Sequence, residues 1–246
     1  MQLNVVTINY NNYDGLKKTL SNISVIKKTF KINYIIIDGN SLDGSKELLN
    51  DYRSVIDVFI SEKDSGIYNA MNKSIPFLKD GYVAYLNSGD VFDINNFQIL
   101  FSEASKGEFD LIYGDYIIKN KNKYKHKSNK SENYLWKGYF CHQSLIVKKD
   151  YLVKFNFDEN LKICGDSKFI LQVINSNALI KKINVPFAII EAGGVSDTKR
   201  VSSIIEQWKI TKKLAHKPSL FIHSYFLCLL LKNITIIFCR KTKELF

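Results

Sequence analysis

Two carboxylates follow an apolar run in the stretch YVAYLNSGDVFD, residues 82–93. The first five residues carry no charge and predict a buried strand, after which the chain turns and presents Asp90 and Asp93. Asn, Ser, Gly and Asp all favour turns, so an ordinary turn would explain the pattern. Carboxylates also suit hard divalent cations, so a metal site at the end of this strand is the alternative interpretation.

Three other predicted strands in the first half also end in polar residues. These strands are predicted at Leu3–Asn9, Asn33–Asp38 and Asp57–Ser61. The polar groups at or just beyond their ends include Asn9, Asp38 and Asp64. Ligands bind open parallel sheets beyond the carboxyl ends of the strands. Any one of these groups could be a turn or a helix cap, but four such strand ends together favour a binding cleft.

Helical patterns separate the strands. Apolar spacing predicts helices over Asp14–Lys28, from the turn near Asp43 to Tyr52, and over residues 67–78. Alternation of strands and helices predicts a parallel sheet with helices on both faces. Asp43 or Ser41 is placed to cap the second helix, and we expect Asp93 to cap a helix as well.

The second half is less regular. We predict two strands around a turn at residues 114–115, a strand over His142–Val147 and a helix that begins near Asp166. A further strand runs into the glycine pair at 193–194. From local sequence alone, Asp166 is best explained as the N-cap of its helix.

The composition indicates a folded α/β domain with a basic C-terminal appendage. The 246 residues are 46% hydrophobic and include only three prolines. The four cysteines lack metal-type spacing and indicate reduced thiols in a cytosolic protein, and no signal peptide is expected. The net charge is +11, with ten Lys or Arg against two Glu from Lys199 to Phe246. The run Lys119–Lys130 has six lysines and is equally compatible with a solvated loop and a functional one. Nucleic acid or an anionic membrane surface would suit such charge.

Seven segments, in this order and spacing, resemble one known family. They are VVTINYN, IIIDGNSLDGS, SEKDSGIYNAMNKSI, VAYLNSGD, FCHQSLIVKKDYL, FDENLKICGDSKFILQV and GGVS. Together they resemble an inverting family 2 glycosyltransferase, in particular the bacterial branch that builds O-antigen, capsule or colanic-acid-type exopolysaccharide. The resemblance implies a GT-A, Rossmann-like α/β domain over residues 1–200, with a mixed sheet flanked by helices. Residues 201–246 would then form a basic, hydrophobic helical tail that associates with the membrane.

By this resemblance the first strand ends would bind a nucleotide-sugar, for which UDP is favoured. The residues implied are Thr7, Asn9, Asp38, Asp64, Asn87 and Gly89. Asp38 would accept hydrogen bonds from the base, since charge-assisted hydrogen bonds are strong. Asp64 is equally placed to cap the next helix. Tyr68 and Asn72 could line the cleft, although a surface position is the simpler expectation.

The family usually has an Asp-x-Asp-like element where this chain has residues 87–90. Here Asn87 and Gly89 replace the earlier acids, and Asp90 alone remains. The resemblance implies that Asp90 holds Mg²⁺ or Mn²⁺ against the donor diphosphate, where a cation offsets the charge of the leaving group. One carboxylate can suffice if phosphate oxygens and water complete the shell.

The resemblance also assigns the other reacting groups. Asp166 matches the family's catalytic base, which deprotonates the acceptor hydroxyl as it attacks the anomeric carbon from the face opposite the nucleotide. His142 and Gln143 match a His-Gln pair on the acceptor or diphosphate side. Gly193 and Gly194 would let the backbone approach the ligand closely.

The C-terminal segment 220–238 is rich in Leu, Ile and Phe but contains scattered polar residues such as His223 and Lys232. We therefore expect it to pack on the domain or to lie in the membrane interface rather than to span the membrane. The basic residues Lys217, Arg240, Lys241 and Lys243 would suit anionic lipid. The implied acceptor is a sugar on polyprenyl diphosphate, and the implied location is the bacterial cytoplasm, peripheral at the inner face of the cytoplasmic membrane.

Three other functions compete with a sugar transferase. A catalytically degenerate, nucleotide-sugar-binding membrane-associated protein is motivated by the incomplete acidic element, and an assay of transfer or donor hydrolysis separates it from an enzyme. A nucleotidyltransferase should carry a glycine-rich, basic phosphate loop near the first strand, which VVTINYNNYDG does not supply. A nucleic-acid binder is the weakest alternative, because the charge lies in a tail and a loop without a recognised module, so we expect no nucleic-acid partner.

Overall fold

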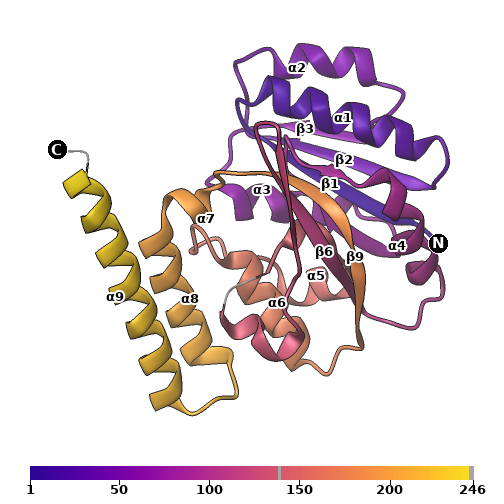
Figure 1. Ribbon diagram of the computed structural model, residues 1–246. Coiled ribbons are helices and arrows are strands. Elements are labelled where there is room, and N and C mark those ends of the chain that lie inside the picture. The colour runs from indigo at the N-terminus through magenta and orange to yellow at the C-terminus, as the bar shows by residue number, and fades with distance from the viewer. Residues whose placement is uncertain (138–139, 244–246) are drawn as a thin grey trace.

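Four parallel strands form the first half of one mixed sheet in the computed structural model, which describes residues 1–137 and 140–243 (Figure 1). β1 (Leu3–Asn9) lies between β2 (Ile32–Asp38) and β4 (Tyr82–Tyr85), and β3 (Val58–Ser61) pairs with β2. Every residue of β1 and β2 is buried. Parallel strands are buried in this way when helices cover both faces of the sheet. The strand predictions for this half are confirmed to within one residue at each end.

The second half of the sheet mixes strand directions. β8 (Leu145–Lys148) runs antiparallel to β4 and to β6 (Leu111–Asn120), whereas β6 is parallel to β9 (Ile180–Glu191). The short β5 (Val91–Phe92) pairs with β9. The strand order is β3-β2-β1-β4-β8-β6-β9-β5, with β7 (Lys123–Lys127) paired to β6. The fold is therefore the expected mixed α/β sheet, with the polar ends of β1, β2 and β4 along one rim.

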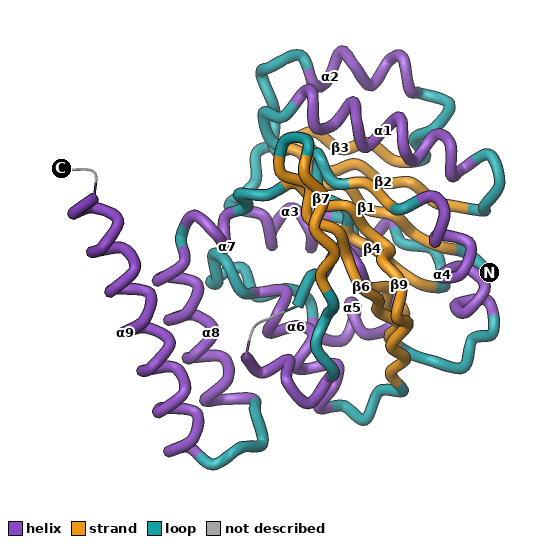
Figure 2. Tube along the Cα trace, viewed as in Figure 1, coloured by secondary structure: helices purple, strands orange, loops and turns teal. Residues whose placement is uncertain are grey.

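The predicted turn at residues 114–115 is wrong, because β6 continues through it. The pairing of β6 with β9 instead shifts register on both sides of Asp115. A Cβ atom on Gly114 would lie 2.5 Å from the Phe187 ring, so only glycine lets the two strands come this close. The lysine-rich run is also not a plain loop: it forms the end of β6 and all of β7, a hairpin that Figure 2 shows in front of the sheet.

Helices cover both faces of the sheet, and each face has its own apolar core (Figure 1). On one face lie α1 (Tyr13–Lys27), α2 (Ser45–Leu48) and α4 (Ile94–Ser105). On the other lie α3 (Ile67–Lys73), α5 (Lys149–Phe155) and α6 (Gly165–Asn175). Val5 belongs to the first core and Val6 to the second, because successive side chains of a strand point to opposite faces.

Short helices and caps complete the connections. The short 3₁₀ turns are Leu49–Tyr52, Ile75–Phe77, Glu132–Lys137 and His142–Ser144. The helix predicted over 67–78 ends at Lys73, and Pro76 within the next turn has no backbone N–H to continue it. Asp93 caps α4 as predicted, accepting a hydrogen bond from the Asn95 N–H. Asp43 accepts hydrogen bonds from the N–H groups of Ser45 and Tyr13, whereas Ser41 is buried.

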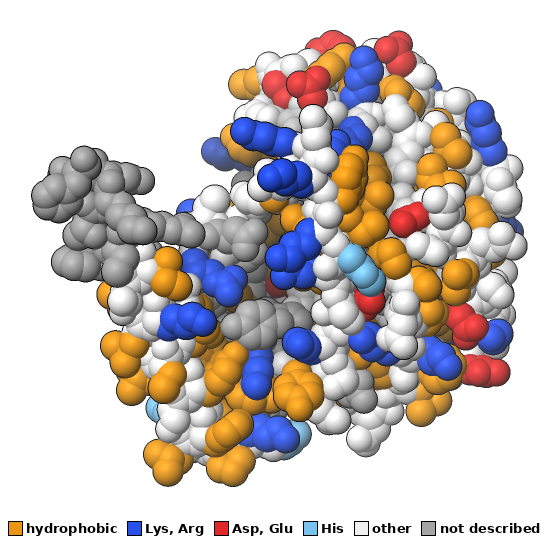
Figure 3. Space-filling model, viewed as in Figure 1, with side chains coloured by type: hydrophobic (Ala, Val, Ile, Leu, Met, Phe, Trp, Pro, Cys, Tyr) orange, Lys and Arg blue, Asp and Glu red, His pale blue; other side chains and the backbone are white. Residues whose placement is uncertain are grey.

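Three helices follow the sheet: α7 (Val195–Thr198), α8 (Arg200–Leu214) and α9 (Ser219–Lys243). Figure 1 shows α8 and α9 side by side at the edge of the molecule, with α8 nearer to α6. Ile222 and Phe226 of α9 are buried, but Leu220, Leu227 and Leu231 are more than half exposed. Figure 3 shows apolar side chains gathered on this part of α9, with Lys and Arg side chains between the helix and the body.

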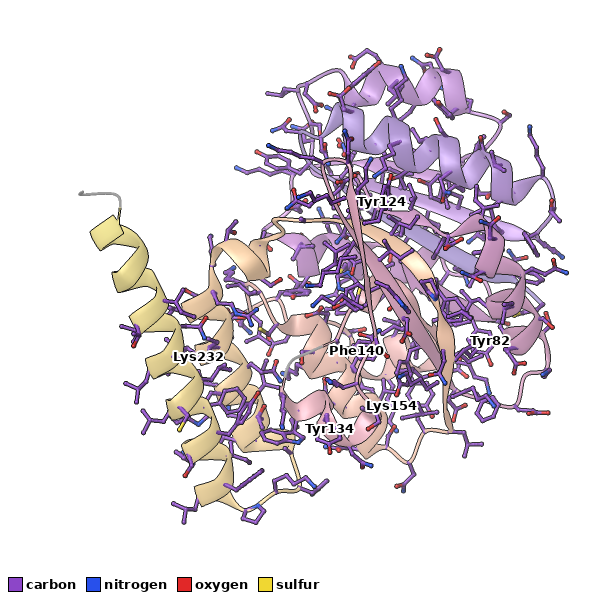
Figure 4. The ribbon with its side chains drawn as sticks, in the orientation of Figure 1. Tyr82, Tyr124, Tyr134, Phe140, Lys154 and Lys232 are labelled. Carbon is purple, nitrogen blue, oxygen red and sulfur yellow. The ribbon has the colours of Figure 1, made fainter. Side chains whose placement is uncertain are left out.

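By length and composition, Ser219–Ile236 could cross a membrane, with a mean hydropathy of 1.5 and only 11% of the window buried. The helix is continuous despite its polar residues, and Lys232 lies exposed along it (Figure 4). The predicted lipid contacts of Arg240, Lys241 and Lys243 concern side chains that the structure does not describe, since for residues 237–243 it describes the backbone of α9 alone. The division of the chain at residue 200 stays a proposal.

Candidate active site

The turn after β4 is fastened to the end of β1. The Ser88 hydroxyl contacts the Ile8 carbonyl at 3.1 Å and the Asn9 side-chain oxygen at 2.8 Å. Gly89 has φ +103°, a conformation that favours glycine, and its N–H donates to the Thr19 hydroxyl. The two strand ends predicted to share a rim are therefore joined by direct hydrogen bonds.

Asp38 lies beneath this rim, 1% exposed. Its carboxylate accepts four hydrogen bonds: from the Asn9 amide, from the Ser41 hydroxyl and N–H, and from the Ser61 hydroxyl. Burial acts to raise the pKa of Asp38, but these hydrogen bonds outweigh it and hold the pKa below the ordinary value. Four bonds use the lone-pair positions that a carboxylate offers. Asp38 thus ties the ends of β1, β2 and β3 together, and its predicted contact with a base would require one bond to be exchanged.

The other residues predicted to bind the nucleotide differ in exposure. Thr7 is fully buried and accepts a hydrogen bond from the Tyr34 hydroxyl, so its side chain supports the rim from inside the core. Asp64 is partly exposed at the rim, where it accepts a hydrogen bond from the Gly66 N–H. A Cβ atom on Gly39 would lie 2.6 Å from Asp64, so glycine leaves room for that carboxylate beside Asp38.

Asp90 is the buried acid of this site, 7% exposed. Its Oδ2 accepts a hydrogen bond from the Gln143 amide at 2.9 Å, and its Oδ1 accepts one from the Glu191 N–H at 3.1 Å. Burial raises the pKa of Asp90 to about 6, against the lowering effect of these two donors and of the nearby His142 and Lys18. Close by, the buried side-chain oxygen of Asn87 has no hydrogen-bond partner in the described part of the chain.

Asp166 is the second acid, and it is not the cap of its helix. The N-cap of α6 is Cys164, and Asp166 lies in the first turn. Its Oδ2 is 2.9 Å from His142 Nδ1, and its Oδ1 accepts hydrogen bonds from the Ser167 N–H and the Tyr68 hydroxyl. Burial acts to raise the pKa of Asp166, but the hydrogen bond and charge of His142 and the other two donors leave it below the ordinary value.

One short turn connects the two acids. His142 and Gln143 are adjacent, and His142 contacts Asp166 while Gln143 contacts Asp90. His142 and Asp166 also border a pocket whose other walls are Met71, Tyr85, Leu145, Val147, Phe157, Phe169 and Ile170. His142 Nε2 is buried without a hydrogen-bond partner among the described residues. Contact with Asp166 therefore fixes the ring, with the proton of the neutral form on Nδ1.

Asn129 holds this turn in place from the far end of the lysine-rich run. It is 2% exposed, donates hydrogen bonds to the Gly114 carbonyl and the Ser144 hydroxyl, both at 2.7 Å, and accepts one from the Cys141 N–H. Figure 4 shows Tyr124 on the same hairpin, where it is 62% exposed. The run thus combines an exposed hairpin with one buried structural amide.

A charged cluster borders Asp90. The carboxylate of Glu191, at the end of β9, pairs with Lys18 and lies 3.7 Å from Lys119. Lys18 also donates to the Gly89 carbonyl at 2.8 Å. Gly193 and Gly194 follow Glu191 in an exposed segment, and Gly193 has φ +91°. The structure therefore places these glycines just after the strand that contacts Asp90.

Sequence reasoning missed several of these contacts. Tyr68 was expected at the surface but is 5% exposed, because its ring packs into the core while its hydroxyl reaches Asp166. Asn72 is partly buried and bonds to Phe157. Nothing in the sequence around Asn129 and Glu191 indicates their contacts, since both residues bond to partners far along the chain.

Comparison with known proteins gives a family match. The Glycosyl transferase family 2 model matches residues 4–169. An uncharacterised glycosyltransferase of Mycobacterium tuberculosis is 32% identical over 90 residues, which cover 37% of this chain and 34% of the relative. The minor teichoic acid biosynthesis protein GgaB of Bacillus subtilis is 23% identical over 192 residues, or 69% of this chain and 21% of that protein. The matches thus span about a third or less of these relatives.

Solved structures share the fold. S. aureus TarS, crystallised with UDP-GlcNAc, superposes with a TM-score of 0.68 at 14% identity and covers 94% of this chain and 72% of that chain. A mannosyltransferase from Pyrobaculum calidifontis, solved with GDP-Man and Mn²⁺, gives a TM-score of 0.70 at 11% identity, covering 91% and 69%. At these identities the likeness concerns the fold.

Proposed function

The chain belongs to glycosyl transferase family 2, and on that premise we propose that it transfers a hexose from a nucleotide-sugar with inversion of configuration. It is a glycosyltransferase with the GT-A type of mixed sheet. We propose a UDP-sugar as donor and a lipid-linked oligosaccharide as acceptor, in the synthesis of a cell-surface polysaccharide such as O-antigen or capsule. Support for this comes from the names of the relatives, which include a teichoic acid biosynthesis protein, and from the UDP-GlcNAc bound to TarS.

The observation that carries the proposal is the turn that links the two acids. His142 contacts Asp166 and Gln143 contacts Asp90, so the positions of the two acids are fixed relative to one another. In the proposed reaction Asp90 lies on the side of the leaving group and Asp166 on the side of the acceptor. Inversion by a single displacement needs this arrangement, because the acceptor attacks opposite the departing diphosphate. Preorganised groups avoid the cost of assembling such a site during the reaction.

Asp166 is the proposed catalytic base. Its lowered pKa keeps it ionised at neutral pH, and three of its lone-pair positions are used by His142, Ser167 and Tyr68. One position is left to accept the proton of the acceptor hydroxyl. The oxygen forms its bond to the anomeric carbon as the bond to the diphosphate breaks, and the proton remains on Asp166.

Residues at the end of β4 fit a hard divalent cation. Asp90 offers a carboxylate with only two hydrogen bonds, and Asn87 offers a buried oxygen without a partner among the described residues. Oxygen ligands of this kind are those that Mg²⁺ and Mn²⁺ prefer. When bound, the cation would neutralise charge on the donor diphosphate. Gly89 gives the turn its shape, and Lys18 and Lys119 add positive charge beside it.

The nucleotide would lie along the rim formed by Asn9, Asp64 and the turn after β4, with Thr7 and Asp38 supporting it from below. Gly193 and Gly194, and the His142 side of the pocket, would face the diphosphate and the acceptor. These assignments rest on the position of the residues along one rim of the sheet and on the resemblance to the family. Each can be tested by substituting the residue and measuring donor binding.

We further propose that α9 attaches the enzyme peripherally to the inner face of the cytoplasmic membrane. Its exposed apolar residues and the basic residues around it suit an anionic lipid surface. Residues 201–246 would then serve attachment and residues 1–200 catalysis. A membrane-surface position would bring the enzyme to an acceptor carried on polyprenyl diphosphate.

A catalytically degenerate nucleotide-sugar-binding protein is the second candidate. It is favoured by Asn87 and Gly89 at acidic positions of the family element, and by the absence of a cluster of three metal-ligating groups among the side chains that the structure describes. Such a protein would bind donor without transferring or hydrolysing it.

The deciding experiment offers a panel of nucleotide-sugars with a lipid-diphosphate-linked sugar acceptor, with and without Mn²⁺. Product mass identifies the transferred sugar, and NMR gives its anomeric configuration. Inverted product from the wild type, absent with Asp166→Asn, is the expected result. A retained configuration would refute the inverting mechanism, and donor binding without any turnover would favour the degenerate alternative.

A further inference from the structure

Glu206 of α8 binds the backbone just before Asp166. Its two carboxylate oxygens accept hydrogen bonds from the N–H groups of Lys162, Ile163 and Cys164, at 3.0, 2.9 and 3.0 Å. These residues precede the first turn of α6. Hydrogen bonds to an ionised acceptor are roughly twice as strong as neutral ones. Glu206 therefore acts as a clamp on the segment 162–164, reaching it from a helix that follows about forty residues later in the chain.

The clamped segment is in turn bonded to the group that orients the base. The Ile163 carbonyl accepts a hydrogen bond from the Tyr68 hydroxyl at 2.7 Å, and the same hydroxyl lies 3.2 Å from Asp166 Oδ1. Gly165, between the segment and Asp166, packs against the face of Tyr68, where a Cβ atom would lie 2.8 Å from the ring. Movement of residues 162–164 would therefore carry both Tyr68 and Asp166 with it.

α8 itself is seated by polar and aromatic contacts. Gln207 and Thr211 both donate to the Trp136 carbonyl, at 3.1 and 2.6 Å. Next to them Trp208 stacks on Phe226 of α9, with ring centroids 6.1 Å apart, and Trp136 contacts the same ring at 6.3 Å. The helix that carries Glu206 thus lies between the exposed α9 and the segment that leads into Asp166.

We propose that Glu206 is a positioning residue for Asp166, which orients the base by holding the backbone segment 162–164 that leads into it. The inference rests on the function proposed above for Asp166. A base must lie within hydrogen-bond reach of the hydroxyl it deprotonates, and a displacement of about 1 Å can cost about 10²-fold in rate. The clamp makes no contact with Asp90 or Asn9, so its loss should lower turnover and spare donor binding.

The test is Glu206→Gln. The amide keeps the length of the side chain but turns an NH₂ group toward at least one of the three backbone N–H groups. We expect transfer to fall about 10²-fold, with unchanged affinity for UDP by calorimetry and faster hydrogen exchange at the amides of residues 162–164. Turnover equal to that of the wild type, or unchanged exchange at these amides, would overturn the inference.

Thr211→Val is the matched control. It removes a hydrogen bond that seats α8 on Trp136 and leaves the Glu206 clamp intact, so it should lower the thermal stability while turnover stays close to wild type. A loss of turnover as large as that of Glu206→Gln would show that helix seating alone matters, which contradicts a specific clamp.

Asp166→Asn is assayed in parallel, so that the two hypotheses can fail separately. Absence of transfer by the wild type would refute the proposed function. If Asp166→Asn loses transfer but Glu206→Gln retains it, only the role of Glu206 is refuted. Loss in both variants, with UDP binding intact, is the expected result.

Discussion

Replacing Asp90 by Asn should make the metal-free protein more stable at neutral pH. Burial raises the pKa of Asp90 from 3.8 to about 6. Because the pKa is higher in the folded than in the unfolded state, ionisation of the carboxylate lowers the free energy of unfolding. The full stability is present below about pH 3.8, and part of it is lost as the pH rises through 6. A shift of about two units, at 1.36 kcal/mol each, corresponds to roughly 3 kcal/mol at pH 7.5.

Asn can satisfy the same neighbours without the charge. Its oxygen can accept the Glu191 N–H, and rotation of the Gln143 amide would present an oxygen to the new NH₂ group. After the cost of that rotation, about 2 kcal/mol should remain, and each kcal/mol shifts the Tm of a chain of this size by roughly 2–4 °C. Thermal unfolding in EDTA at pH 7.5 should therefore show a gain of about 4 °C or more, which disappears near pH 4.

Adding Mn²⁺ and UDP should reverse the order of the two proteins. A ligand that binds only the native state at 100 times its Kd stabilises it by about 2.7 kcal/mol, and the wild type should gain this while Asp90→Asn does not. Asp93→Asn is the control, since Asn caps a helix about as well as Asp. A loss of stability in Asp90→Asn without metal would refute the burial argument. Equal stabilisation of both proteins by Mn²⁺ and UDP would refute the metal assignment.

Three other variants test separate parts of the site and the surface. Asp166→Asn should bind nucleotide-sugar normally and lose about 10²- to 10⁴-fold of its transfer rate; near-normal product formation would reject Asp166 as the base. Asn129→Ala removes three buried hydrogen bonds, so urea unfolding should show a loss of roughly 3 kcal/mol together with slower transfer, and an unchanged midpoint would contradict its role in holding the turn at 141–144. The pair Leu227→Glu and Leu231→Glu, on the exposed face of α9, should abolish co-sedimentation with anionic vesicles and leave UDP binding intact; undiminished vesicle binding would argue against attachment through α9.

The pattern of apolar residues in the sequence correctly predicted the strands that are buried along their whole length. β1 and β2 are continuous apolar runs, and they form completely buried parallel strands at the expected positions. The turn predicted at Gly114 is wrong because turn-forming residues can also mark a β-bulge. Whether a turn or a bulge forms depends on a partner strand some seventy residues later. The conformational propensities of the local residues could not distinguish the two, since the contact that matters is between Gly114 and Phe187.

Residue type predicted which groups could react, but not what surrounds them. Asp90 contacts Gln143 and Glu191, which lie 53 and 101 positions away. Asp166 was ambiguous because Asp is common both at helix N-termini and at active sites. Its partners Tyr68 and His142 come from other elements, 98 and 24 positions away, and only folding brings them together.

The contrast between the two acids follows from how many donors each one has. Asp90 is buried with two hydrogen bonds, so desolvation prevails and its pKa rises to about 6. Desolvation also acts to raise the pKa of Asp166, but a histidine, a backbone N–H and a tyrosine hydroxyl outweigh it, and the pKa falls. Environments that separate the pKa values of neighbouring carboxyl groups also separate their chemical roles. A carboxylate such as Asp90, whose burial is only partly offset by its neighbours, is suited to bind a cation, whereas one such as Asp166, whose burial is fully offset, stays ionised and can take a proton from an acceptor hydroxyl. Because His142 and Gln143 each serve one of these acids, a change in this single turn should disturb both roles together.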